Sequence, residues 1–188
     1  MPRPTTPSSP PDRVGSPPVK LLPDGRYYEE LHRRLTAARR RVYVSVFLFS
    51  PRWYDKTVNL LADFTAASQR GLHCRLVLAA APIKIGRRRP NQETAQRLLS
   101  AGWQVRVMTG NRTLHEKLIL IDDQTVIFGS HNLAWSSIAS NFELSVCIED
   151  EGLNRQAETL FWQRWQLASA PDPNLWELAT PLVLPFVP

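Results

Sequence analysis

The sequence predicts one α/β domain, an α/β/α sandwich with a mixed, mostly parallel sheet. Segments whose apolar residues recur at helical spacing alternate with short runs that are dense in β-branched residues, which is the pattern of helices packed on a sheet. Several of these runs are apolar at almost every position, as in strands that are buried on both faces. The chain has 188 residues, a length that suits a single domain with its own core, and we expect that domain over residues 22–170.

The first half of the domain is predicted to hold a helix followed by a right-handed strand-helix-strand unit. Leu31 and Leu35 share one face of the first helix, and Asp24 is its expected N-cap. A connection between parallel strands is right-handed in nearly all proteins. In chain order we expect a helix over 24–40, a strand over 41–49, a helix over 55–71 and a strand over 74–80.

The second half continues the alternation after an interrupting basic loop. This loop, PIKIGRRRP, places Lys84, Arg87, Arg88 and Arg89 between two prolines. The turn Asp122-Asp123-Gln124 joins two apolar strands, and the last helix is expected to bury Leu160, Phe161, Trp165 and Leu167. In order we expect a helix over 91–102, strands over 103–108, 117–121 and 125–130, a short helix over 133–140, a strand over 143–150 and a helix over 152–169.

Both ends of the chain differ from the domain in composition. Residues 1–21 are rich in Pro and Ser and are expected to be a disordered leader, and residues 171–188 form a Pro-rich apolar tail that we expect to dock on the domain or on a second subunit. We find no secretory signal and no apolar run of the length that spans a membrane, which favours a cytoplasmic location. Cys74 and Cys147 lack metal-ligand spacing and indicate a reducing compartment without a zinc site or disulfide framework.

The charge of the chain favours a phosphate-rich partner. Its 23 Lys and Arg against 17 Asp and Glu give a net charge of +6 and a pI near 9.8. Nucleic acids and anionic membrane surfaces attract such a protein.

One stretch, LHEKLILIDDQTVIFGSHN, carries the reactive residue types. On a strand His115 and Lys117 share a face while Glu116 points to the other. Ser130 and Asn132 follow the neighbouring strand, where Gly129 permits a close backbone approach. Ammonium, hydroxyl and amide donors that converge in this way suit the oxygens of a phosphate.

Two acidic positions receive different expected roles. Glu143 opens the last strand and is the best candidate to hold an imidazole N–H and so fix its tautomer. Asp122 lies in the turn, where its carboxylate is expected to hydrogen-bond backbone groups of the hairpin.

The same residue types are compatible with three alternative roles. A Ser-His-Asp hydrolase would use Ser130, His115 and Asp122, but the G-x-S-x-G elbow is absent and a lysine beside the base depresses its basicity. A purely structural role would have these polar residues cap two strands. A metal centre would place a divalent cation beside the Lys117 ammonium, with a donor set of His115, His131, Asp123 and Glu143.

The stretch resembles the phospholipase D superfamily, whose signature is HxKxxxxD followed six residues later by GSxN. Here His115, Lys117 and Asp122 are followed, after DQTVIF, by GSHN ending at Asn132. The order of helices and strands before the motif is also similar, so the resemblance covers roughly residues 22–168 and implies the superfamily's phospholipase D/nuclease fold. Every motif position is intact.

The resemblance implies a phosphodiesterase that needs neither metal nor cofactor. It implies that His115 attacks phosphorus to form a phosphohistidine, and that Lys117 and Asn132 bind the phosphoryl oxygens. Ser130 would support the phosphate pocket and Glu143 would orient His115, while Asp122 and Gly129 would be structural.

The chain holds one motif, whereas in-line displacement at phosphorus needs a nucleophile and an acid for the leaving oxygen. His131 falls at the variable position of GSxN and is expected to be a bystander. A two-fold homodimer would place His115 and Lys117 of both subunits around one pocket. Single-motif members of the superfamily, the Nuc-like small nucleases, are similar in this respect.

Nucleic acid is the favoured substrate, because the basic loop of Lys84, Arg87, Arg88 and Arg89 would follow a phosphate backbone. Phospholipid is the alternative, suggested by the apolar tail and the superfamily's name activity. A catalytically silent nucleic-acid-binding module is the third possibility.

Overall fold

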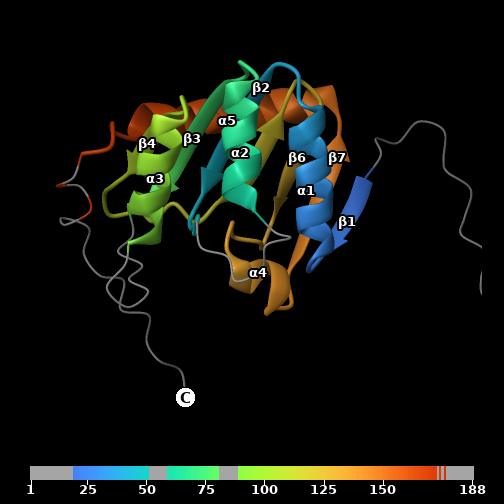
Figure 1. Ribbon diagram of the computed structural model, residues 1–188. Helices are drawn as coiled ribbons and strands as arrows, with labels where there is room; N and C mark the ends of the chain where they lie inside the picture. Colours follow the sequence, from blue (N-terminus) through green and yellow to red (C-terminus); the bar gives the residue numbers. More distant parts are fainter. Residues whose placement is uncertain (1–18, 51–58, 81–88, 173, 175, 177–188) are drawn as a thin grey trace, which may run out of the picture.

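The computed structural model describes residues 19–50, 59–80, 89–172, 174 and 176. These residues form a seven-stranded sheet in the order β1-β7-β6-β5-β2-β3-β4, with helices on both of its faces (Figure 1). The strands are β1 Val19–Pro23, β2 Arg41–Val46, β3 His73–Ala79, β4 Gln104–Met108, β5 Lys117–Ile121, β6 Thr125–Gly129 and β7 Leu144–Glu149. The helices are α1 Arg26–Ala37, α2 Leu60–Gln69, α3 Pro90–Ser100, α4 Trp135–Ala139 and α5 Glu151–Leu167.

The predicted α/β/α sandwich with a mixed sheet is confirmed, but the expectation that parallel pairing would dominate is wrong. In the described sheet β2 pairs with β3 and β3 with β4 in parallel. The four other pairs, from β1 across to β2, are antiparallel. The turn between β5 and β6 is too short for the crossover that parallel strands need, so these two strands pair in antiparallel fashion.

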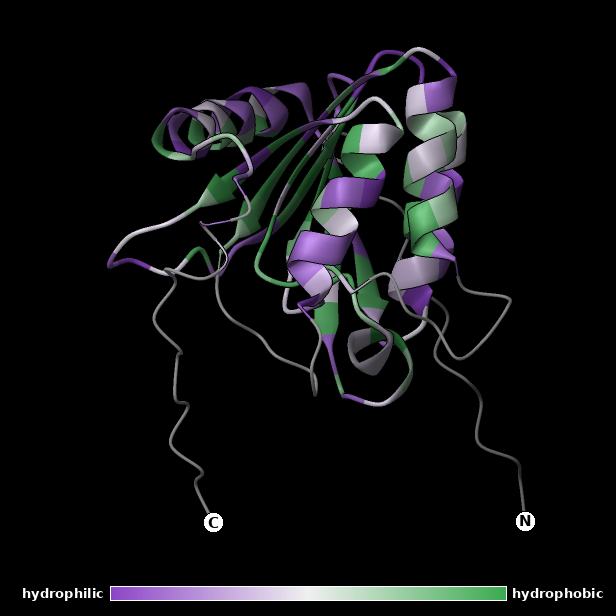
Figure 2. Cartoon of the chain, turned by 60° about the vertical axis from the view of Figure 1, so that its left-hand side comes forward, coloured by the Kyte–Doolittle hydropathy of each residue, from purple (hydrophilic) through white to green (hydrophobic). Residues whose placement is uncertain are grey.

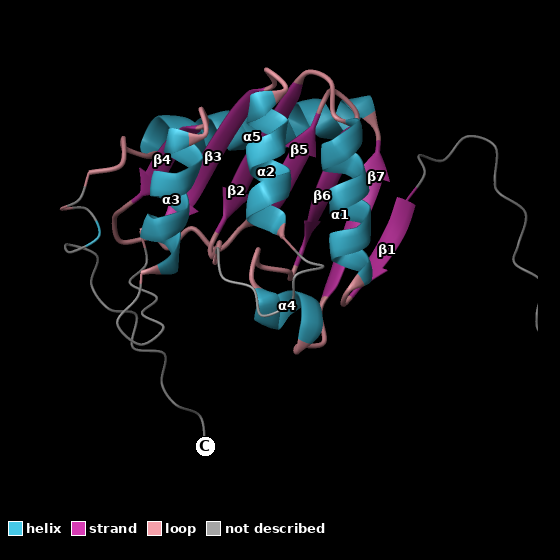
Figure 3. Ribbon diagram, in the orientation of Figure 1, coloured by secondary structure: helices cyan, strands magenta, loops and turns pink. Residues whose placement is uncertain are grey.

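The sheet separates two hydrophobic layers. Helices α1, α2 and α3 cover one face and α5 crosses the other (Figures 1 and 3). Alternate residues of β2 divide accordingly: Val42 and Val44 belong to the core under α1–α3, and Tyr43 belongs to the core under α5. The apolar strands therefore lie between two amphipathic layers (Figure 2). Both cysteines are buried and free.

The start of the domain lies earlier than the sequence suggested. Residues 19–21, which we expected in the disordered leader, belong to β1, which pairs with β7 along the edge of the sheet. The rest of the leader, most of the tail and Lys84, Arg87 and Arg88 of the basic loop lie outside the described residues. Trp176 is 5% exposed and belongs to the core under α1–α3.

The expected burial along α5 is wrong at two positions. Phe161 is fully buried and Trp165 is partly buried, but Leu160 and Leu167 are 48% and 69% exposed. The helix lies on the sheet through Asn154, Ala157 and Phe161, whose spacing defines its inner face. Leu160 and Leu167 lie to one side of that face.

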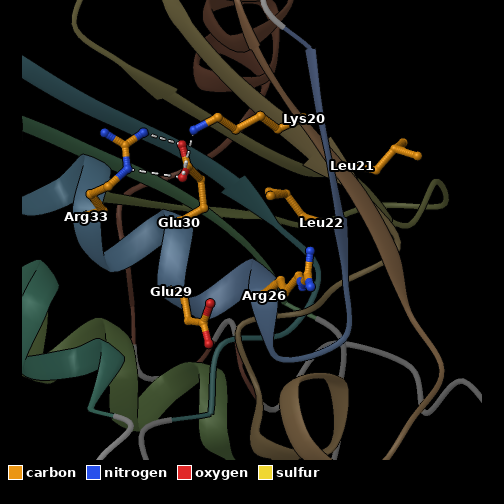
Figure 4. A pocket seen from close by; sticks show the side chains of 7 residues that line it. All are labelled: Lys20, Leu21, Leu22, Arg26, Glu29, Glu30 and Arg33. Carbon is orange, nitrogen blue, oxygen red and sulfur yellow. Dashed lines mark hydrogen bonds and ion pairs between the residues drawn. The ribbon is translucent and has the colours of Figure 1, made fainter. Parts of the chain in front are cut away.

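A groove runs between β1 and α1, apart from the motif residues (Figure 4). Lys20 of β1 and Arg33 of α1 both reach the carboxylate of Glu30 within it. Across the described part of the chain, every helix is too short or too polar to cross a membrane.

Candidate active site

The motif residues meet at one edge of the sheet. His115 stands just before β5 and Lys117 begins it, while Gly129 ends the neighbouring β6. Glu143 comes directly before β7, which pairs with β6. Because β5, β6 and β7 are antiparallel, the start of β5, the end of β6 and the start of β7 lie side by side. These strand ends, which α4 borders (Figure 1), are the candidate active site, and we call them the site edge.

His115 and Lys117 are in direct contact. The Lys117 Nζ lies 3.3 Å from each ring nitrogen of His115 and donates a hydrogen bond of 2.8 Å to its carbonyl oxygen. The ring of Phe47 packs beside both, 4.8 Å from the His115 ring and 5.4 Å from the ammonium. An exposed imidazole is therefore held next to a fixed positive charge.

The surroundings lower the pKa of both groups. Partial burial, followed by the charge of Lys117, lowers the pKa of His115 from its ordinary value of 6.5. Burial also lowers the pKa of Lys117, although the Glu143 carboxylate acts in the opposite direction. Both causes favour the uncharged His115 ring, the form in which a nitrogen lone pair is free to attack.

Glu116 lies on the opposite face of the sheet, as the alternation of a strand predicts. Its carboxylate accepts a hydrogen bond of 2.9 Å from Ser45 and pairs with Arg164 of α5 at 2.5 Å. Glu116 therefore fastens α5 to the sheet behind the site.

Glu143 is held by groups other than His115. Its carboxylate accepts hydrogen bonds from the Ser130 hydroxyl and, at 3.2 Å, from the Asn141 amide. Burial raises the pKa of Glu143, but hydrogen bonds from Ser130, Asn141 and Ser137 outweigh it, so the net pKa lies below the ordinary 4.5. The expected pairing of Glu143 with the His115 imidazole is not among the contacts of this single chain.

Ser130 belongs to the same group of hydrogen-bonded residues around Glu143. Besides donating to Glu143, its Oγ accepts a hydrogen bond of 3.0 Å from the Leu144 N–H. The hydroxyl thus joins the end of β6 to the start of β7 and places the Glu143 carboxylate at the site edge.

Asp24 fixes the backbone of Glu143 and is not the helix cap that we expected. Its carboxylate accepts a hydrogen bond of 2.9 Å from the Glu143 N–H, and its own N–H donates to the Glu143 carbonyl at 3.1 Å. Gly25 occupies the N-cap of α1, without a side-chain hydrogen bond. Asp24 adopts a φ of 47°, a conformation that asparagine and aspartate tolerate better than other side chains.

His131 is buried, and each of its ring nitrogens has a hydrogen-bond partner. Its side chain stacks on Tyr27 at 4.3 Å, its Nδ1 lies 2.8 Å from Ser145 Oγ and its Nε2 lies 3.1 Å from the Asp24 carbonyl oxygen. A carbonyl only accepts, so Nε2 carries the proton and Nδ1 accepts from the serine. Burial lowers the pKa of this ring. His131 secures the turn that carries Asp24 and has no access to the site edge.

Asn132 lies between the end of β6 and the segment after β2. Its N–H donates to Ser137 Oγ at 3.3 Å, and the next residue, Leu133, pairs with Phe49. The Asn132 Oδ1 is buried and has no hydrogen-bond partner among the described residues. A buried amide oxygen without a partner is costly, so this oxygen is able to accept a further hydrogen bond.

Gly129 is required by close packing between β6 and β7. A Cβ at this position would lie 2.3 Å from Ser145 Oγ and 2.5 Å from the Leu144 carbonyl oxygen. The close backbone approach predicted here is present.

Asp122 and Asp123 lie at the far end of the hairpin, away from the site edge. The Asp122 carboxylate accepts hydrogen bonds from the backbone N–H groups of residues 39–41, the segment that leads into β2. It therefore binds backbone as expected, but in the neighbouring segment instead of its own hairpin. Asp123 pairs with Arg40.

This placement separates the residues of the alternative sites. Asp122 is too far along β5 to join Ser130 and His115 in a triad. The four donors considered for a metal centre are also apart, because Asp123 lies at the other edge of the sheet and His131 is enclosed by Tyr27.

The other two histidines also lie away from the site. His32 on α1 pairs with Asp63 at 3.0 Å, and His73 begins β3 at the edge opposite to His115. All four histidines of the chain are described. One chain therefore brings a single imidazole to the site edge.

Three residues that shape the site were not predicted from the sequence. Phe47 flanks the His115 ring, and Asp24 and Asn141 bind Glu143. Asn141 stands two positions before Glu143 in an extended segment, which is a usable signal of a shared face. Asp24 lies 119 residues from its partner, and no local pattern connects the two.

Comparison with known protein families agrees with this geometry. The model of the family described as "Cardiolipin synthase, PLD-like domain" matches residues 31–165. Cardiolipin synthase A of Yersinia pseudotuberculosis is 27% identical over 131 residues, which are 70% of this chain and 26% of that protein. The chain thus spans about a quarter of the length of the curated relatives that it matches.

Two solved structures share the fold across nearly their whole length. Nuc from Salmonella typhimurium, a phospholipase D family member, has a TM-score of 0.72 at 18% identity and is covered to 98%, with 82% of this chain. NucT from Helicobacter pylori has a TM-score of 0.65 at 15% identity and is covered to 100%, also with 82% of this chain. At these identities the likeness is one of fold.

Proposed function

The chain belongs to the family of PLD-like domains described for cardiolipin synthases, and from this premise we propose that it is a phosphodiesterase whose nucleophile is His115. The observation that carries the proposal is the contact between the exposed His115 imidazole, whose pKa is lowered, and the Lys117 ammonium at one edge of the sheet. An attacking nitrogen and a cation for the phosphoryl oxygens are the two parts that displacement at phosphorus requires first.

The reaction proceeds through a phosphohistidine. A ring nitrogen of His115 attacks phosphorus and the bond from phosphorus to the leaving oxygen breaks, while a second imidazolium gives that oxygen its proton. Water then attacks the phosphohistidine and passes a proton to the second imidazole, and the phosphorus–nitrogen bond breaks. Lys117 and the amide of Asn132 bind the phosphoryl oxygens, and Ser130 and Glu143 complete the pocket.

The second imidazole is His115 of another copy of the chain. His32, His73 and His131 are each held elsewhere in the described structure. A homodimer in which both copies of His115 face one phosphate supplies the missing acid. Two adjacent imidazoles bind one proton more readily than two, because two neighbouring positive charges repel each other. One imidazole therefore acts as nucleophile and the other as acid.

Nucleic acid is the substrate class that the charge distribution favours. Arg112 is exposed shortly before His115, and Arg89 is the N-cap of α3 near the same edge. The segments that connect Ser50 to Asn59 and Ala80 to Arg89 carry five further cations in the sequence, Arg52, Lys56, Lys84, Arg87 and Arg88, against one acid. An excess of cations attracts a polyphosphate chain and makes its binding dependent on salt.

Phospholipid is a second candidate, favoured by a separate observation. Phe142, next to Glu143, is fully exposed, and an exposed aromatic ring beside a phosphodiesterase site suits a lipid surface. The curated relatives named cardiolipin synthase point in the same direction. The two substrates share the phosphodiester and differ in what surrounds it.

The deciding experiment measures cleavage by the purified chain in the presence of EDTA. The substrates are single-stranded and double-stranded DNA, RNA, an aryl phosphodiester and phosphatidylglycerol vesicles, each with a His115→Ala control. We expect cleavage of nucleic acid and of the aryl ester that is lost in the variant. Activity that EDTA abolishes would contradict the mechanism, and cleavage of vesicles alone would select the lipid substrate.

Mixing wild type with the His115→Ala variant tests the shared site directly. When subunits exchange freely, activity should follow the square of the wild-type fraction, because a mixed dimer holds one His115. A linear dependence would mean that each chain acts alone. The Glu29→Gln variant, which alters an exposed residue on α1, should mix with wild type without loss.

A further inference from the structure

His131 is a buried polar residue that the proposed reaction leaves without a role. It stands between Ser130 and Asn132 in the chain, and its side chain is 0% exposed. A polar group at this depth is costly unless its hydrogen bonds are made. Both of its ring nitrogens have partners, so the residues that they bind indicate what the imidazole does.

The first partner is the carbonyl oxygen of Asp24, in the turn between β1 and α1. It accepts the Nε2–H of His131 at 3.1 Å and the N–H of Tyr27 at 3.1 Å. The Tyr27 ring stacks on the imidazole with an angle of 4° between the two planes. Asp24 adopts a φ of 47°, which an L-residue other than glycine keeps only where its surroundings hold it. The bond from His131 is one of the contacts that hold it.

Asp24 in turn binds the backbone of Glu143 on both sides of its Cα. The Asp24 carboxylate accepts the Glu143 N–H at 2.9 Å, and the Asp24 N–H donates to the Glu143 carbonyl at 3.1 Å. These bonds depend on the conformation of Asp24, because a change in its φ moves the N–H and the side chain together. His131 therefore acts on Glu143 through Asp24.

The second partner of His131 is Ser145 on β7, whose hydroxyl donates to Nδ1 over 2.8 Å. Ser145 stands two residues after Glu143 and therefore shares its face of the strand. It also pairs with Gly129 of β6. The imidazole thus joins the turn at Asp24 to the start of β7, on which Glu143 lies.

This arrangement requires the particular chemistry of a neutral imidazole. One ring nitrogen donates while the other accepts, and the flat ring fits against Tyr27. Burial lowers the pKa of His131, which favours the neutral form. A phenylalanine would keep the stacking and lose both hydrogen bonds, whereas a glutamine has a donor and an acceptor to offer.

We propose that His131 is a positioning residue: it holds Asp24 in the conformation that binds the Glu143 backbone and so places the Glu143 carboxylate at the site edge. Ser130 binds the side chain of the same glutamate, so two consecutive residues hold Glu143, one directly and one through Asp24. The inference rests on the proposed function. It assigns a role to a histidine that the sequence marks as a bystander.

Steady-state kinetics on the aryl phosphodiester test the role. His131→Phe should lower kcat by about tenfold or more and change KM by less than about threefold. His131→Gln should keep at least about a third of the wild-type kcat. Ser145→Ala releases the other end of the ring without adding bulk and should lower kcat by about threefold, which keeps the test open if His131→Phe does not fold.

The matched control is Asn154→Leu. Asn154 is also 0% exposed, and its side chain bonds Arg41 and the Thr125 carbonyl at α5, away from Glu143. This variant loses buried hydrogen bonds as His131→Phe does, but its kcat should stay within about twofold of wild type. An equal loss of kcat in both variants would overturn the positioning role and assign the effect to general destabilisation.

A double-mutant cycle tests the route through Asp24. If His131 acts by holding Asp24, its substitution has little left to remove once the Asp24 carboxylate is gone. Adding His131→Phe to Asp24→Ala should therefore lower kcat by less than about twofold further. Two losses that multiply in full would show that His131 acts by another route and would overturn the inference.

Hydrogen exchange of the Glu143 amide, followed by NMR, supplies a readout that needs no activity. Relative to the amide of Val44 in the core, exchange at Glu143 should rise by about tenfold in His131→Phe and stay near wild type in His131→Gln and Asn154→Leu. Unchanged exchange in His131→Phe would overturn the inference, as would faster exchange with an unchanged kcat. Faster exchange in a protein that cleaves no phosphodiester would keep the link from His131 to Glu143 and refute the proposed function.

Discussion

Replacing Glu30 by Gln should destabilise the protein in a manner that depends on pH. The Glu30 side chain is 10% exposed between β1 and α1 (Figure 4). It accepts hydrogen bonds from Arg33 Nε at 3.1 Å and Arg34 Nε at 2.8 Å, and Lys20 Nζ lies 3.4 Å away. The hydrogen bond from Arg33, with that from Arg34 and their charges, outweighs burial and lowers the pKa of Glu30 from 4.5 to about 2.

The magnitude follows from that shift. A carboxylate whose pKa is lower in the folded chain stabilises the fold above its unfolded pKa, and the contribution is lost as pH falls toward the folded pKa. The interval from 4.5 to about 2 corresponds to roughly 3 kcal/mol at pH 7, and linkage leaves roughly half of this at pH 3. Glu30→Gln should therefore cost roughly 2 to 3 kcal/mol at pH 7, because the amide oxygen still accepts one hydrogen bond.

Urea unfolding followed by circular dichroism at pH 7, 4 and 3 measures the effect. The difference in unfolding free energy between wild type and Glu30→Gln should shrink steadily from pH 7 to pH 3. Glu29→Gln, at the exposed neighbouring position, should change stability by less than about 0.5 kcal/mol. An equal penalty for Glu30→Gln at pH 7 and pH 3 would refute the electrostatic account and assign the effect to packing.

Three further predictions concern the site edge. Lys117→Met removes one of the causes that lower the pKa of His115, so the His115 ring should titrate at higher pH by NMR, and an unchanged titration would assign the whole shift to burial. Gly129→Ala places a Cβ 2.3 Å from a side-chain oxygen of β7 and should cost about 3 kcal/mol, measured by thermal unfolding; a loss smaller than about 1 kcal/mol would contradict the tight packing. Asp24→Ala removes the acceptor of the Glu143 N–H and should lower kcat more than it raises KM, while Asp24→Asn keeps an acceptor oxygen and should restore most of the activity; equal loss in both variants would argue against this positioning role.

Much of the site could be predicted because it follows from short-range rules. His115 and Lys117 are neighbours on one face because alternate residues of a strand share a face, and the structure brings them into contact. The turn at Asp122 and the close approach at Gly129 follow from backbone constraints that act within a few residues. These constraints fix the spacing of the residues in the phospholipase D-like signature, which is why the family could be identified from the motif.

Burial on α5 and the direction of strand pairing were less predictable. Leu160 and Phe161 are similar in hydrophobicity, yet Phe161 is buried and Leu160 is not. The difference depends on which strands α5 crosses, and strand order is a property of the whole sheet. The same holds for the four antiparallel pairs, which a local alternation of helix and strand cannot distinguish from parallel ones.

The amino-acid sequence alone specifies the chemical groups of this protein: an imidazole beside an ammonium, one motif per chain, and a basic composition suited to a phosphodiester. The surroundings of these groups are set by the assembled fold. It binds Glu143 to Ser130 and Asp24 and encloses His131 against Tyr27. The physical reason is range: side-chain chemistry and strand periodicity act over a few residues, whereas these contacts form between segments that meet only when the sheet is assembled.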